Sequence, residues 1–304
     1  MTTKYPLPND VLESFANIPV ENLLATALGF RALLPQGKLS QKTKDLGELV
    51  TQADLELQKI IIEYFESSSL AGSYYLKSEE AIGEQNKLLD RSQLKWQLVI
   101  DPLDGTNSFA RGESDWGIMI GLCDLQGNLI YSWNLISTGE IYSTANLPDF
   151  SARSLNSLSP AEPTFTVDVF DYGSTAIEEF PDIFQHLSSN GLLSKELVIT
   201  SFPSAVITAW EFANRRLDAL VWVSSDKGKR IFPDYDLIFT GALAGLDAQI
   251  GIGWAMEQIQ AVVVARSVPE FDFLWQTAIS LLPKTTTEQL ICNRNLKITT
   301  PVNF

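Results

Sequence analysis

Hydrophobic positions in the first third of the chain recur with the spacing of amphipathic helices. In residues 20–34, VENLLATALGFRALL, leucines and alanines fall three or four residues apart. Residues 54–67, DLELQKIIIEYFES, repeat the pattern, and their apolar side consists of Leu57, Ile60, Ile61, Tyr64 and Phe65. We predict one helix in each segment, with its apolar face on a core.

From residue 96 onward the pattern changes to short apolar runs that are typical of strands. These runs are residues 96–100, 116–123, 128–136 and 140–145. Turn-forming residues separate them, for example Asp124 and the stretch Gln126-Gly127-Asn128. We therefore predict an antiparallel meander.

Residues 146–163, NLPDFSARSLNSLSPAEP, are rich in Ser, Pro and Asn, which indicates a boundary. After it, strand and helix patterns alternate. Strands are predicted near 165–171, 196–200, 217–223 and 261–267, and helices near 204–215, from Asp236 and over 270–282. Interleaved helices and strands predict an α+β or α/β layered sandwich of two packed halves, residues 1–149 and 150–304.

Composition and charge narrow the possible partners. The chain has 304 residues, 45% of them hydrophobic, and a formal net charge of −15. Such a charge repels nucleic acid, and it repels phosphorylated ligands too unless bound metal ions invert the local field. We see no signal peptide and no apolar run that could span a bilayer, so we expect a cytoplasmic protein without a membrane partner. Two distant cysteines, Cys123 and Cys292, fit a reducing compartment.

The stretch LVIDPLDGTNSF, residues 98–109, ends an apolar run with two aspartates, Asp101 and Asp104. Asp-Pro and Asp-Gly are also turn-forming pairs, so a plain turn is the alternative. Further acidic residues with ordinary surface or capping interpretations are Asp54, Glu79, Glu80 and Asp236. Their joint occurrence, in this order around residues 101–106, is harder to explain by those ordinary interpretations than any one of them alone.

These residues, in this order, resemble the inositol monophosphatase-like family of magnesium-dependent, lithium-sensitive phosphatases. The matching motifs are Asp54, Glu79-Glu80, Asp101-Pro-Leu-Asp-Gly-Thr106 and Tyr235-Asp236, and the resemblance is strongest over residues 49–145. It implies two to three Mg²⁺ ions. The implied ligands are Glu79, Asp101, the Leu103 carbonyl, Asp104 and Asp236, with Asp101 shared between two ions.

The resemblance also implies a reaction, the hydrolysis of a small phosphomonoester by direct attack of a metal-activated water. Thr106, oriented by Asp54, would position that water, and Glu79 would assist. The phosphate and the rest of the substrate would meet Gly105, Thr106, Ser204, Ala205 and Asp236. Lys42 or Lys44 would neutralise nearby negative charge, and a homodimer is expected.

Haloacid-dehalogenase phosphatases share an Asp-Gly-Thr ending, but their nucleophilic aspartate would fall at Pro102. The substrate region departs from the family, because Pro203 replaces a glycine and a basic cluster replaces an acidic partner; the cluster is Lys227, Lys229 and Arg230. This cluster is either a solvated loop or a contact for a second anionic group. The resemblance implies an inositol or related sugar phosphate as substrate, and these departures leave the choice between the two open. The alternatives are a 3′-phosphoadenosine or sugar bisphosphate phosphatase, or a non-catalytic relative that binds a phosphorylated ligand.

Overall fold

A computed structural model describes most of the chain. The described residues are 8–33, 41–43, 49–78, 86, 91–127, 129–143, 164–171, 182, 196–202, 204–214, 216–224, 249–255, 258–266, 268–282 and 291–293.

The first sheet has five strands in the order β3-β4-β5-β6-β7. Its strands are β3 (Tyr74–Ser78), β4 (Trp96–Asp104), β5 (Gly117–Asp124), β6 (Leu129–Ile136) and β7 (Ile141–Ser143). β4 to β7 pair antiparallel, as the predicted meander requires, and β3 adds a parallel edge strand. The four strand predictions of the first half are therefore confirmed.

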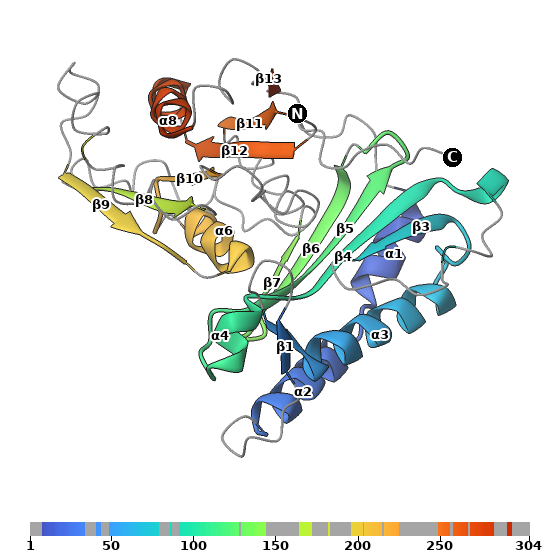
Figure 1. Cartoon of the computed structure of the whole chain (residues 1–304). Helices are drawn as coiled ribbons and strands as arrows, with labels where there is room; N and C mark the ends of the chain where they lie inside the picture. Colours follow the sequence, from blue (N-terminus) through green and yellow to red (C-terminus); the bar gives the residue numbers. More distant parts are fainter. Residues whose placement is uncertain are drawn as a thin grey trace.

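Three helices cover one face of this sheet (Figure 1): α1 (Asn9–Ala16), α2 (Val20–Arg31) and α3 (Gln52–Ser67). Alternate side chains of β4 and β5, such as Leu98 and Ile120, pack there against Leu57, Ile61 and Phe65 of α3. Each such buried side chain stabilises the fold by about 1.5–3 kcal/mol. The two helices predicted from periodicity are thus present, and their apolar faces form this core.

The second sheet has six strands in the order β13-β11-β12-β10-β8-β9. Its strands are β8 (Thr164–Asp171), β9 (Glu196–Thr200), β10 (Ala219–Val223), β11 (Gln249–Ala255), β12 (Gln258–Ala265) and β13 (Ile291–Asn293). β8 is parallel to both β9 and β10, and the remaining pairs are antiparallel. Helix α8 (Val268–Leu281) packs on the outer face against Val167, Val221 and Val263.

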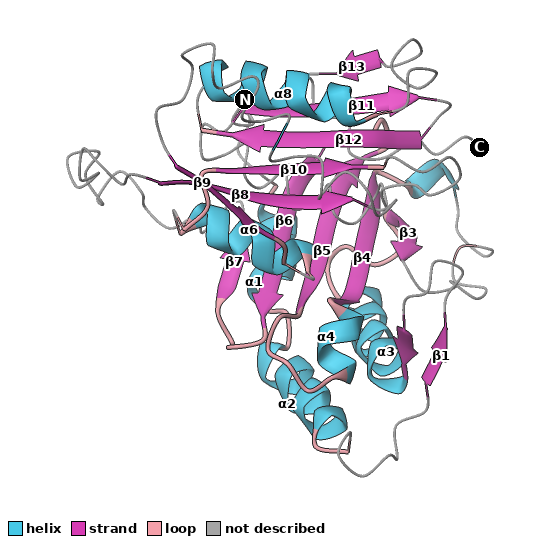
Figure 2. Cartoon of the chain, turned by 60° about the vertical axis from the view of Figure 1, so that its left-hand side comes forward, coloured by secondary structure: helices cyan, strands magenta, loops and turns pink. Residues whose placement is uncertain are grey.

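Helix α6 (Ala205–Ala213) lies between the two sheets (Figures 1 and 2). It shares one buried cluster with side chains of both sheets, among them Val99 and Met119 on one side and Leu220 and Val262 on the other. The layers therefore run helix, sheet, helix, sheet, helix, and the predicted layered sandwich of two packed halves is confirmed. Because helices cover both faces of the first sheet, β4 is buried on both sides. A strand of an antiparallel meander commonly has one face exposed to solvent.

Several short elements escaped the sequence interpretation. They are α1, β3, β11, β13, the 3₁₀ turn Arg91–Gln93 and the hairpin of β1 (Gln41–Thr43) and β2 (Leu49–Thr51). Most span fewer than eight residues, which is too few for a clear periodicity. The predicted boundary at residues 146–163 and the helix predicted from Asp236 lie outside the described residues. Among the helices that are described, none is long and apolar enough to cross a membrane.

Gly117 sets how closely α6 approaches the first sheet. A Cβ atom at this position would lie 2.5 Å from the Leu135 carbonyl oxygen and 2.6 Å from a methyl group of Val206 in α6. Any larger residue at position 117 must therefore push α6 away from the sheet or distort the β5–β6 ladder.

We predict that Gly117→Ala lowers the free energy of unfolding by about 1–3 kcal/mol, the usual cost of overpacking. Gly29→Ala in α2 is the matched control, because no neighbour lies within 4 Å of the added methyl. It should stabilise the helix by about 0.5–1 kcal/mol. Urea unfolding of both variants measures the difference, and a Gly117→Ala protein as stable as wild type would contradict the tight packing of α6.

Candidate active site

The motif Asp101-Pro-Leu-Asp104 lies on a bulge at the end of β4. Asp101 pairs with Met119 of β5 and Asp104 pairs with Gly117, so three steps along β4 correspond to two along β5. Pro102 fits the bulge because it has no N–H to donate to the ladder. In a regular strand, side chains three residues apart point to opposite faces of the sheet. The extra residue of the bulge breaks this alternation, so Asp101 and Asp104 can belong to one site.

Local hydrogen bonds fix the groups of this bulge. The Leu103 N–H donates to Oδ1 of Asp101 at 3.0 Å, and the Thr106 hydroxyl donates to the Leu103 carbonyl oxygen at 2.8 Å. Asp101, Leu103 and Thr106 are all buried. A carbonyl oxygen has two lone pairs, so the bond from Thr106 leaves Leu103 able to accept a second partner.

Gly105 lets the chain turn from β4 into the short helix α4 (Thr106–Ala110). Its φ of +83° lies in the left-handed region, which side chains disfavour. A Cβ atom would also lie 2.4 Å from the Asp115 carbonyl oxygen and 3.0 Å from Cβ of Ser204. Glycine is therefore required here on two grounds, and the chain of the second half approaches it closely.

Asp104 joins the two halves of the molecule. Its Oδ2 accepts a hydrogen bond from the Ser204 hydroxyl at 2.5 Å and another from the Val206 N–H at 2.7 Å. Ser204 is the N-cap of α6, and its oxygen also accepts from the Ile207 N–H at 3.3 Å. The sequence interpretation gave Ser204 and Ala205 to the substrate. The structure places the Ser204 hydroxyl on Asp104, and a substrate contact by either residue stays a prediction.

Asp54 is fully buried in the first turn of α3, directly after β2. β2, which directly precedes α3, contacts α4, so the first turn of α3 with Asp54 follows a strand that packs on the helix begun by Thr106. The only O–H proton of Thr106 lies in its bond to Leu103, so Thr106 does not donate to Asp54 in this conformation. Lys42, one of the two lysine candidates, lies in β1 opposite Val50, and Lys44 lies outside the described residues.

The described donor set fits a hard divalent cation only in part. Asp101, the Leu103 carbonyl and Asp104 offer oxygen ligands from one bulge, which is the chemistry that Mg²⁺ prefers. Among the described residues, no three His, Cys, Asp or Glu side chains are close enough to hold a metal ion. The further predicted ligands Glu79 and Asp236 lie outside the described residues, as do Glu80, Tyr235 and the basic cluster of Lys227, Lys229 and Arg230.

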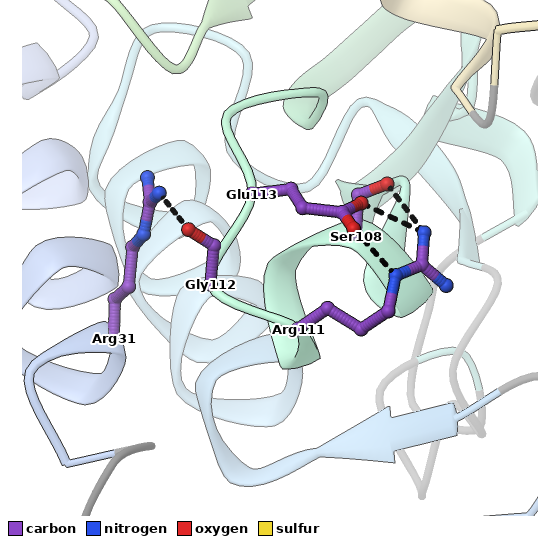
Figure 3. A network of polar contacts seen from close by, with 5 residues as sticks. All are labelled: Arg31, Ser108, Arg111, Gly112 and Glu113. Atoms are coloured by element: carbon purple, nitrogen blue, oxygen red, sulfur yellow. Dashed lines mark hydrogen bonds and ion pairs between the residues drawn. The ribbon is translucent and has the colours of Figure 1, made fainter.

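A short polar network fastens the end of α4 (Figure 3). Arg111 binds both carboxylate oxygens of Glu113, at 2.8 and 2.7 Å, and also reaches the Ser108 hydroxyl. Arg31, from the end of α2, donates to the Gly112 carbonyl oxygen. The Arg111–Glu113 pair is largely exposed, so water screens it and its contribution to stability is small. The network connects α2 to the turn that follows the candidate site.

Asp168 is a buried carboxylate that the sequence interpretation missed. It lies in β8 and accepts hydrogen bonds from the Phe202 N–H and the Trp222 indole N–H, both at 2.9 Å, and at 3.5 Å it shares weakly in the Thr208 O–H, whose nearer acceptor is the Ser204 carbonyl oxygen at 3.0 Å. Burial raises the pKa of Asp168 to about 6, although these three donors act to lower it. The only sequence signal was an acidic residue within the apolar run TFTVDVF.

The raised pKa predicts a pH dependence of stability. Because the folded pKa exceeds the ordinary value of about 3.9, the protonated carboxyl favours folding. Its contribution is complete below about pH 4 and is lost as the pH rises through about 6. Between these limits the free energy of unfolding of wild type should fall by up to about 3 kcal/mol more than that of Asp168→Asn. Urea titrations at several pH values measure this, and parallel curves would contradict it.

Comparison with known proteins supports the resemblance. The model of the inositol monophosphatase family matches residues 14–147, which include α3, β4, the bulge and α4. No curated protein sequence matches the chain.

Solved structures share the fold over both halves. The extragenic suppressor protein suhB from Bartonella henselae is 13% identical, covers 88% of this chain and 97% of its own, and has a TM-score of 0.57. The Thermotoga maritima IMPase is 16% identical, with coverages of 85% and 95% and a TM-score of 0.52. An IMPase/NADP phosphatase complexed with Mg²⁺ and phosphate is 13% identical, with coverages of 84% and 94% and a TM-score of 0.53. The resemblance to the inositol monophosphatase family is thus confirmed: residues 14–147 match the family model, and the chain has the family's fold.

Proposed function

We propose that the protein is a Mg²⁺-dependent phosphatase that hydrolyses a small phosphomonoester. The observation that supports this proposal is the bulge at the end of β4, which carries Asp101, the Leu103 carbonyl and Asp104 within four residues and in which Asp104 is bound to the start of α6. The family match over residues 14–147 and the fold of an IMPase/NADP phosphatase with Mg²⁺ and phosphate support the same reaction class.

The roles of the metal ligands follow from oxygen chemistry. Asp101, the Leu103 carbonyl and Asp104 would hold Mg²⁺, together with Glu79 and Asp236. When bound, the metal would lower the pKa of water and offset the negative charge of the phosphate in a chain of net charge −15. Asp104 is well prepared for this role, because Ser204 and Val206 bind one of its oxygens and thereby fix its orientation.

Thr106 would orient the attacking water. Because its O–H proton is used on the Leu103 carbonyl, the lone pairs of the Thr106 oxygen would accept a hydrogen bond from the attacking water. Asp54, buried at the start of α3, is the predicted partner of Thr106 in positioning this water. The N–H groups of Gly105 and Thr106, with Ser204, Ala205 and Asp236, would contact the substrate.

The proposed substrate is a small phosphate monoester, and an inositol or related sugar phosphate is the leading candidate. NADP and 3′-phosphoadenosine compounds belong in the test panel, because a neighbour of the same fold is an IMPase/NADP phosphatase. A protein that only binds such ligands is the opposing hypothesis. Release of inorganic phosphate from this panel, with Mg²⁺ and with a chelator, separates the two.

We predict that Asp104→Asn lowers turnover at least about 100-fold, because it removes a charged metal ligand and several kcal/mol of transition-state stabilisation. The matched control is Asp124→Asn. Asp124 pairs with Trp96 at the opposite end of the same sheet, so its replacement should leave turnover within about twofold of wild type. Phosphate release by the folded Asp104→Asn protein at the wild-type rate, or undiminished release in chelator, would contradict the proposal.

We also predict that Thr106→Ala lowers kcat by about 10²–10⁴, the range of general acid–base assistance, with little change in phosphate affinity. Thr106→Ser keeps the hydroxyl and should retain most of the activity. Steady-state kinetics and inhibition by inorganic phosphate measure the two effects separately. If Thr106→Ala raises KM and leaves kcat unchanged, Thr106 binds substrate and does not orient water.

A further inference from the structure

The segment from Phe202 to Thr208 is bound by carboxylates from both halves of the molecule. Asp104 of the first half binds Ser204 and Val206. Asp168 of the second half binds the Phe202 N–H and, more weakly, the Thr208 hydroxyl. Asp104 thus binds the start of α6, and Asp168 binds the chain two residues before the N-cap Ser204; of the two carboxylates, Asp104 belongs to the candidate active site.

Asp168 is itself held in one orientation. It has no exposed surface, and the indole N–H of Trp222, in the neighbouring strand β10, donates to its Oδ2 at 2.9 Å. Oδ1 then receives the Phe202 N–H at 2.9 Å. Burying a charged group costs folding free energy, and a helix N-terminus can be capped without a second carboxylate. A contribution to stability therefore does not account for Asp168 well.

We propose that Asp168 is a positioning residue for the active site: by fixing the backbone at Phe202, it places Ser204 and Val206 where they bind and orient Asp104. Three hydrogen bonds connect the residues involved. Trp222 binds Asp168, Asp168 binds Phe202, and Ser204, two residues further along the chain, binds Asp104. Its catalytic meaning rests on the proposed function, in which Asp104 is a metal ligand. Its structural part, the control of the contact between Asp104 and α6, does not.

Amide hydrogen exchange tests the structural part without metal or substrate. The first N–H groups of a helix have no partner within the helix. Protection of the Val206 and Ile207 amides therefore reports their bonds to Asp104 and to the Ser204 hydroxyl. In Asp168→Asn, one oxygen is replaced by an NH₂ donor, so Phe202 or Trp222 loses its acceptor. We expect exchange at Val206 and Ile207 to become about tenfold faster, the effect of one weakened hydrogen bond.

Asp218→Asn is the matched control. Asp218 precedes β10 and accepts the Thr166 N–H at 2.8 Å, a similar bond that does not involve the segment of residues 202–208. It should leave exchange at Val206 and Ile207 unchanged. If Asp168→Asn fails to fold, Trp222→Phe removes a single donor from Asp168 and keeps an aromatic ring in place; it should accelerate the same two amides by a smaller factor.

Kinetics test the catalytic part. In Asp168→Asn the half-saturating Mg²⁺ concentration should rise about tenfold, while kcat at saturating Mg²⁺ falls much less. Because Asp168 acts partly through Ser204, Asp168→Asn should cost less in the Ser204→Ala background than in wild type, and the remainder reflects the Val206 N–H that still binds Asp104. Unchanged protection of Val206 and Ile207 in Asp168→Asn, or fully additive effects on Mg²⁺ dependence, would overturn the proposal. A wild type without phosphatase activity would instead refute the proposed function, and the exchange result would still decide the role of Asp168.

Discussion

The bond between Asp104 and the start of α6 is the constraint on which the arrangement of this protein depends. Asp104 ends the longest strand of the first sheet, and α6 lies between that sheet and the second. One carboxylate oxygen accepts from a hydroxyl and from a backbone N–H of the other half, 100 and 102 residues further along the chain. Charge-assisted bonds of this kind are short and directional. They fix where the second half sits on the bulge.

Packing around this bond is unusually close. Gly105, which follows Asp104 in the chain, and Gly117, which pairs with Asp104 in β5, are positions where a Cβ atom would collide with neighbouring atoms. These two glycines, one of them in a left-handed turn, allow the chain of the second half to approach the first sheet, and the bulge at Pro102 places Asp101 and Asp104 in the arrangement that the proposed metal site requires. The sequence features that signal the site, Pro102 and Gly105, are therefore the features that permit this arrangement.

Much of the fold could be predicted because long periodic segments determine it. Residues 54–67 and the meander after residue 96 carry clear patterns, and the motif of residues 101–106 pointed to the site. Asp168 could not be recognised, because its strand alternates between polar and apolar residues as if Thr166 and Asp168 faced water. α6 covers that face instead. The contact between Ser204 and Asp104 depends on how the two sheets pack, and the local sequence around either residue does not predict that packing.

A crystal structure of the protein with Mg²⁺ and inorganic phosphate tests the central claim most directly. We expect an ion bound by Asp101 and Asp104 at the bulge, with phosphate beside Thr106 and with Asp104 still accepting hydrogen bonds from Ser204 and Val206. An ion and phosphate bound elsewhere, or an Asp104 that has left α6 in order to bind the ion, would contradict a metal site braced by the second half.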